Sequence, residues 1–255
     1  MSRTTWFCVS RRARFIGAVA ILFAACFAAP VRADFIGSVQ INFDSGSESG
    51  SFQLNLPANL DYYRWSLAAP VNVYSSENPG NLLATINGFS VELDGDPGVS
   101  LGFAVSAAAV DTHITVTSST VAFAPLVNPL AFATAAITVT DDDSSPSGAS
   151  VTGLFPGNLA YRATYNGTTT FADLVLPVTA ATDSSAIGSG RFPLAGMTVI
   201  AGAVSSISSQ FDFMLSANDS ASGTSRFNVV PEPSTLALGT IGALGLAWRL
   251  RRRRG

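Results

Sequence analysis

The sequence of 255 residues contains no lysine, because every basic residue of the lysine and arginine class is an arginine. It has one histidine, His113, and its two cysteines, Cys8 and Cys26, both lie near the N-terminus. Without lysine the chain cannot form a P-loop, a lysine Schiff base or a Ser-Lys catalytic pair. Without cysteine beyond residue 26, the rest of the chain has no disulfide, no catalytic thiol and no cysteine zinc site.

Positive charge is scarce in the middle of the chain and concentrated at its ends. Residues 34–230 contain four arginines and 16 of the 17 acidic residues, so their formal net charge is −12. A nucleic-acid partner is therefore disfavoured, because neutralising phosphates requires a clustered basic face. The acidity predicts a hydrated, soluble surface.

Residues 1–33 have the three parts of a secretory signal peptide. A basic segment, Arg3–Arg14, precedes an apolar segment, Phe15–Ala29, that is too short for a comfortable membrane span. Small residues then occupy positions −3 and −1 of a cleavage site between Ala33 and Asp34. This order predicts an N-terminal signal helix that is removed during export. A lipoprotein signal ending at Cys26 is the less favoured alternative.

Residues 34–230 show apolar residues at every second position, separated by turns rich in Gly, Asn, Asp and Pro. The alternation is clearest in VQINF (39–43), FQLNL (52–56), FSVEL (89–93), LGFAV (101–105), HITVT (113–117), AAITVT (135–140) and FDFML (211–215). Short strands without helical segments between them predict an all-β fold, a jelly-roll-like or Ig-like β-sandwich.

The segment DDDSSPSGAS, residues 141–150, interrupts this pattern. It is either a linker between two small sandwiches, 34–140 and 151–230, or a long hairpin loop within one sandwich. We favour the hairpin loop, and therefore a single passenger domain over residues 34–230.

The strand around His113 is the natural place to look for catalysis, since histidine is the commonest general base. Asp111 and His113 alternate with apolar residues, so both are expected on the polar face of one strand. No G-x-S-x-G nucleophile motif is present, and the nearest string, GSESG at 46–50, has Glu48 at its centre. We therefore expect a surface histidine beside a surface aspartate, and no enzyme.

Two groups of carboxylates are candidates for glycosidase chemistry or for calcium binding. Asp94 and Asp96 lie in the turn LDGDPG, and Asp141, Asp142 and Asp143 open the interrupting segment. An EF-hand spacing is absent, and a calcium site at 141–143 would require Asp142 to fold back beside its neighbours. Turn formation is the favoured role of both groups, so no metal or other cofactor is expected.

The aromatic segment LDYYRWSL offers a platform for sugars in Tyr62, Tyr63 and Trp65. Core packing is favoured, because Tyr63, Trp65 and Leu67 alternate as the buried face of a strand does. We also expect Asp94, Asp96, Trp65 and His113 to be scattered rather than gathered in one concavity.

The C-terminal tail, residues 231–255, differs from the rest of the chain. Pro231 and Pro233 end the β-domain near Val230, because proline cannot continue a central strand. Residues 234–250 form an apolar stretch of 17 residues, about 25 Å long as a helix, which is short for a ~30 Å hydrocarbon core. An interfacial aromatic residue and a stop-transfer cluster lie at and after the end of this stretch: Trp248, Arg249, Arg251, Arg252, Arg253 and Arg254.

The combination of Pro231, Glu232 and Pro233 with a single hydrophobic helix and an arginine cluster closely resembles the PEP-CTERM sorting domain of Gram-negative bacteria. The resemblance covers about 25 residues and implies nothing about residues 34–230. It implies recognition of the Pro-Glu-Pro site by a membrane-embedded exosortase, removal of the tail, and export to the cell surface or extracellular matrix. Such proteins commonly accompany exopolysaccharide production.

The sequence as a whole predicts an exported, non-catalytic surface or matrix protein that is anchored in the membrane only before processing. Its expected partners are an exosortase and exopolysaccharide. One alternative is a secreted carbohydrate-binding or carbohydrate-active domain. Another is a periplasmic domain that its C-terminal helix anchors permanently.

Overall fold

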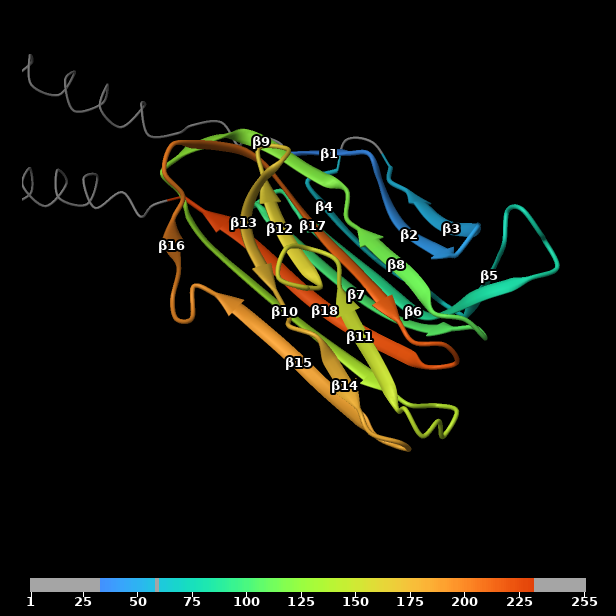
Figure 1. Ribbon diagram of the computed structural model, residues 1–255. Helices are drawn as coiled ribbons and strands as arrows, with labels where there is room; N and C mark the ends of the chain where they lie inside the picture. Colours follow the sequence, from blue (N-terminus) through green and yellow to red (C-terminus); the bar gives the residue numbers. More distant parts are fainter. Residues whose placement is uncertain (1–32, 58–59, 232–255) are drawn as a thin grey trace, which may run out of the picture. The chain divides into compact units, whose positions relative to one another are not determined.

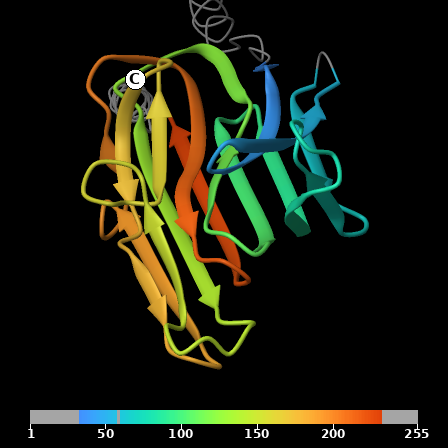
Figure 2. The same cartoon turned by 45° about the vertical axis from the view of Figure 1, so that its right-hand side comes forward.

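Alternating apolar and polar residues form strands throughout residues 33–57 and 60–231, the part of the chain that the computed structural model describes. The strands are antiparallel and build two sheets that face each other (Figures 1 and 2). Six of the seven segments predicted from alternation lie wholly within a strand, and FQLNL extends one residue past the end of its strand at Asn55, so the predicted all-β sandwich is confirmed. No helix in this part of the chain is long and apolar enough to cross a membrane.

The first sheet has ten strands, and its principal order is β1-β9-β17-β8-β2-β3. Long β17 also pairs along its other edge with β11 and β12, which extend the sheet through β14 and β13. The ten strands are β1 (Asp34–Ile36), β2 (Ser38–Ser45), β3 (Glu48–Asn55), β8 (Thr112–Thr117), β9 (Thr120–Val127), β11 (Ala149–Gly153), β12 (Tyr161–Tyr165), β13 (Thr169–Leu174), β14 (Val178–Ala180) and β17 (Ala203–Leu215).

The second sheet has eight strands in the order β15-β10-β18-β7-β6-β4, with β16 paired to β10 and β5 paired to β6. The strands are β4 (Tyr62–Ser66), β5 (Val71–Tyr74), β6 (Leu82–Asp94), β7 (Gly98–Ala107), β10 (Leu130–Thr140), β15 (Ser185–Phe192), β16 (Thr198–Val199) and β18 (Ser220–Val230). Its centre is an uninterrupted ladder in which all eleven residues of β18 pair with β10.

Aromatic rings join the inner faces of the two sheets. Phe103 of β7 packs against Phe211 and Phe213 of β17, with ring centroids 5.0 and 5.6 Å apart. Phe171 of β13 stacks on Phe227 of β18 at 5.1 Å. Offset and edge-to-face rings of this kind add to the free energy gained by burying apolar area. The core therefore lies between the sheets, and their polar residues face outward.

The segment after β10 does not form the expected hairpin. β10 belongs to the eight-stranded sheet and β11 to the ten-stranded sheet, so residues 141–148 carry the chain from one sheet to the other. The connections after β7, β14 and β17 also change sheets. The Asn218 amide donates to the Ala108 carbonyl and joins the connections after β17 and β7, while the Asp141 amide donates to the Ser184 carbonyl in the connection after β14. The hairpin prediction failed because alternation identifies strands but not their partners.

Candidate functional site

The C-terminal signal begins inside the sandwich. Val229 and Val230 are the last residues of β18 and pair with Ala131 and Leu130 of β10. The Val229 amide also donates to the Pro97 carbonyl at 2.9 Å. Because β18 is a central strand, the chain passes from the middle of a sheet to Pro231 with no linker between them. The end of the domain at Val230 agrees with the strand-terminating role predicted for the prolines.

The other predicted residues of this signal lie outside the described part of the chain. These are Glu232, Pro233, Trp248, Arg249, Arg251, Arg252, Arg253 and Arg254, together with the predicted helix over 234–250. The signal helix and residues 1–32 lie outside it as well. At the predicted cleavage site, Ala33 is buried and Asp34 opens β1, which pairs with β9. Cleavage between these two residues stays a prediction.

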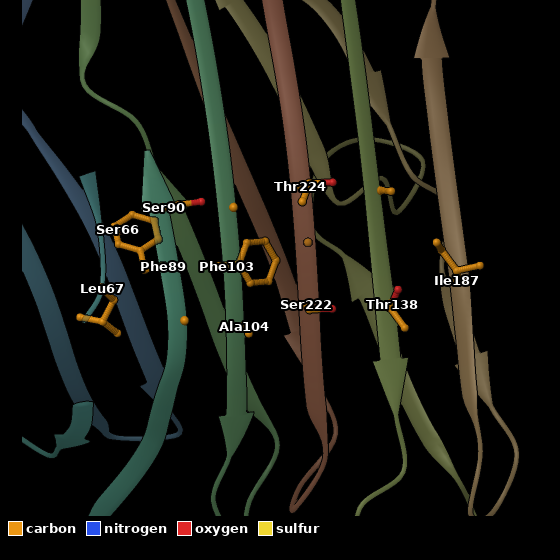
Figure 3. Close-up of a pocket in the computed structure, with 14 residues that line it drawn as sticks. Ser66, Leu67, Phe89, Ser90, Phe103, Ala104, Thr138, Ile187, Ser222 and Thr224 are labelled. Carbon is orange, nitrogen blue, oxygen red and sulfur yellow. The ribbon is translucent and has the colours of Figure 1, made fainter. Parts of the chain in front are cut away.

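The outer face of the eight-stranded sheet carries a row of small residues, here called the hydroxyl row. Strand register places one member on each of six neighbouring strands, in the order Ser66, Ser90, Gly102, Thr224, Ala136 and Ser189. Because none of these side chains is large, the face is hollowed here by a depression of about 470 Å³ (Figure 3). The residues that line the depression include no Asp, Glu, His, Lys or Arg.

The next row on the same face, here called the arginine row, holds three of the four arginines of residues 34–230. It runs through Arg64, Glu92, Ser100, Arg226, Thr134 and Arg191. Arg226 Nε donates to Asn228 Oδ1 at 2.7 Å, and the Arg191 guanidinium lies 4.9 Å from the centre of the Phe132 ring. Sequence reasoning counted these arginines but missed the row, which only strand register reveals.

His113 lies on the outer face of the ten-stranded sheet, between two carboxylates from neighbouring strands. Its Nε2 is 2.6 Å from Asp212 Oδ1 and its Nδ1 is 3.6 Å from Asp44 Oδ2. Asp111, the expected neighbour, instead accepts a hydrogen bond from the Ala217 amide at 3.0 Å. The surface position of His113 is as predicted, but the identity of its partner was wrong, because Asp111 lies before β8 begins and its carboxylate bonds the turn after β17.

Trp65 packs toward the core, as alternation predicted. Its ring lies 6.1 Å from both Phe52 and Phe89, and it contacts the buried cluster together with Tyr63 and Leu67. Asp94 lies on the outer face of β6, and its Oδ1 accepts from the Asp96 amide at 3.0 Å, so the two aspartates shape a turn. With His113 in the other sheet, the predicted scatter of these four residues is confirmed.

The structure brings Asp141 and Asp143 together, but with Asp219 and not with Asp142. One carboxylate oxygen from each of Asp141, Asp143 and Asp219 lies within 4.8 Å of the other two. Asp219 belongs to the turn between β17 and β18, and Asp142 is exposed. Burial, and repulsion from Asp143 and Asp141, raise the pKa of the Asp219 carboxyl, although hydrogen bonds from Ser216 and Asp142 oppose the shift.

Comparison with known proteins identifies the tail but not the sandwich. Residues 229–253 match the family described as the PEP-CTERM protein-sorting motif. No curated protein matches the chain. Two solved structures align with it at very low similarity. One is the VP2 subviral particle of infectious bursal disease virus, at 12% identity, covering 88% of this chain and 74% of that one, with a TM-score of 0.11. The other is a mutant of the same VP2 protein in T=1 particles, at 14% identity, 88% and 72% coverage and a TM-score of 0.10. Scores this low support no inference about the sandwich.

Proposed function

We propose that this chain, which carries a PEP-CTERM protein-sorting motif, is a non-catalytic component of a cell surface or extracellular matrix that associates with exopolysaccharide. The motif itself marks the chain for export, for recognition by an exosortase and for transient anchoring through its C-terminus. The association with polysaccharide and the absence of catalysis are the proposed part.

The outer face of the eight-stranded sheet carries this proposal. A polysaccharide presents many hydroxyl groups, and the hydroxyl row offers side-chain hydroxyls on four of its six strands, from Ser66, Ser90, Thr224 and Ser189. The arginine row lies directly beside it, and guanidinium groups bind carboxylate and sulfate groups through paired hydrogen bonds. Three of the four arginines of residues 34–230 lie in this row, and this local clustering favours an anionic polysaccharide as the ligand even though the net charge of these residues is −12.

The chemistry of the depression supports a non-catalytic role. Glycoside hydrolysis usually requires a pair of carboxyl groups flanking the scissile bond. The depression is lined by hydroxyl, glycine and apolar residues, with no carboxyl group among them. This lining favours adhesion to a polymer over its cleavage.

Sedimentation with anionic exopolysaccharide from an exporting bacterium tests the proposal, using the full-length chain purified in detergent. Thr224→Glu with Ser189→Glu adds two negative charges to exposed positions of the hydroxyl row. Ser51→Glu with Gln53→Glu adds the same charge at exposed positions on the outer face of the ten-stranded sheet, and is the matched control.

We expect the first pair to weaken binding on the order of tenfold, because like charges repel at close range, and the control pair to retain it. If both double variants weaken binding equally, the outer face of the eight-stranded sheet is not the binding face. Association with anionic polysaccharide is wrong if the unaltered chain does not sediment with it.

A further inference from the structure

The three clustered carboxylates lie where the chain passes twice between the sheets. Asp141 and Asp143 belong to the connection from β10 to β11, and Asp219 belongs to the connection from β17 to β18. The two connections are directly joined, because the Asp142 amide donates to Asp219 Oδ1 at 3.4 Å. The cluster is therefore held by backbone from both sheets.

One oxygen in this cluster is buried and has no partner. Asp141 is 6% exposed; its Oδ2 accepts from the Asp183 amide at 2.7 Å, whereas its Oδ1 has no hydrogen-bond partner among the described residues. A buried carboxylate oxygen without a donor is costly, and nearly all buried polar atoms in proteins find a partner. Asp141 Oδ1 therefore requires a donor or a cation from beyond the described residues.

The surrounding residues supply hydrogen bonds but no positive charge. Asp219, which is 1% exposed, also accepts from the Ser216 hydroxyl. Asp143 accepts from the Ser145 amide at 2.8 Å and from Asn218 Nδ2 at 3.3 Å. Among residues 33–57 and 60–231, no ion pair includes any of the three carboxylates. Three carboxyl groups thus lie close together without a counter-ion from the described part of the chain.

We propose that Asp141, Asp143 and Asp219 bind a calcium ion. The ligands are all carboxylate oxygens, which hard cations prefer, and no imidazole or thiolate is present to select a transition metal. Calcium bonds oxygen at about 2.3–2.6 Å, so opposite ligands are separated by roughly 5 Å and the 4.8 Å cluster fits around it. Octahedral magnesium, at about 2.0–2.1 Å, requires a tighter arrangement and gives up its waters reluctantly.

Bound calcium would join the two connections, and through them the two sheets. It would pair with the buried Asp141 carboxylate and offset the repulsion between the three carboxylates. Because the ion binds the folded arrangement and not the separated strands, it would stabilise the sandwich by mass action. Calcium binding would also explain why acidic residues stand at positions 141 and 143, which turn formation alone does not explain.

Calorimetric titration of the full-length chain with calcium chloride, after treatment with a chelator, tests this site. We expect one calcium per chain with a dissociation constant of roughly 0.1–1 mM, the range of extracellular calcium modules, and weaker binding of magnesium. Asp141→Asn and Asp219→Asn should each weaken calcium binding at least ~10-fold, because each replaces a charged ligand. Asp142→Asn is the matched control: it removes the same charge from an exposed neighbour and should leave the constant unchanged.

Thermal unfolding provides a second measurement, in which calcium should raise the Tm of the unaltered chain and of Asp142→Asn by more than it raises the Tm of Asp219→Asn. The proposed calcium site is refuted if the unaltered chain shows neither heat of binding nor a Tm change at about 10 mM calcium. This concentration is ten or more times the expected dissociation constant. The site is also refuted if Asp142→Asn loses as much affinity as Asp219→Asn. If a variant does not fold, the calcium titration of the unaltered chain alone tests whether the chain binds calcium.

Discussion

Alkaline pH is expected to destabilise the sandwich through one residue, Tyr161. Its side chain is fully buried and its hydroxyl lies 2.9 Å from Ser209 Oγ. Burial raises the pKa of Tyr161 from 10.0 to about 12, because a phenolate loses its hydration inside the core. Between these two values the folded chain keeps a proton that the unfolded chain releases. The stabilisation is therefore complete below about pH 10 and is lost as the pH rises toward 12.

A difference of two pH units corresponds to about 2.7 kcal/mol in the free energy of unfolding. This loss in the free energy of unfolding is measured by denaturant titrations at several pH values between about 9 and 12. The full-length chain and its Tyr161→Phe variant are compared. The chain contains no lysine, so no lysine titration overlaps this window. We expect the unaltered chain to lose about 2–3 kcal/mol more than Tyr161→Phe over this interval. Equal losses in the two proteins would refute the assignment to Tyr161.

Two further substitutions test the packing, each against a matched control. A Cβ at Gly223 would lie 2.5 Å from two atoms of the Phe103 ring, so Gly223→Ala should destabilise the fold by about 1–3 kcal/mol. At Gly88 the nearest atom to such a Cβ is 3.7 Å away, so Gly88→Ala should change stability by no more than about 0.5 kcal/mol; similar denaturant midpoints for the two variants would contradict the packing argument. Arg162 makes paired bonds of 2.7 and 2.8 Å to Asp173 from a partly buried position, so Asp173→Asn should cost about 1–3 kcal/mol. Glu92→Gln removes the exposed 3.9 Å contact to Arg64 and should cost under about 1 kcal/mol, and a larger loss from Glu92→Gln than from Asp173→Asn would overturn this ranking.

The strands of the sandwich could be predicted because period-two alternation is a local property of the sequence. HITVT and FDFML both form strands as expected, and the side of each strand that faces the core was also predicted correctly. Their pairing with each other, which aligns Asp212 with Thr115 and brings it to His113, could not be predicted. Pairing depends on the packing of the whole sheet, and alternation does not encode it.

The same limit explains what was missed in the candidate sites. The Pro-Glu-Pro tail is contiguous, so its motif was readable directly from the sequence. The carboxylate cluster joins Asp141 and Asp143 to Asp219, which is distant in sequence and lies in an ordinary turn. No local signal marks Asp219 as the third member. The arginine row was hidden for the same reason, since each arginine lies on a different strand.

The position of the C-terminus in the exported protein distinguishes removal of the tail from permanent anchoring in the membrane. Mass spectrometry of the protein released from the cell surface determines it directly, with a Pro231→Ala, Pro233→Ala variant as the control for recognition of the motif. Because the sandwich ends at Val230 and the matched motif begins at Val229, we expect a C-terminus near residues 230–235. Released protein that still carries Arg251, Arg252, Arg253 and Arg254 would contradict processing by an exosortase.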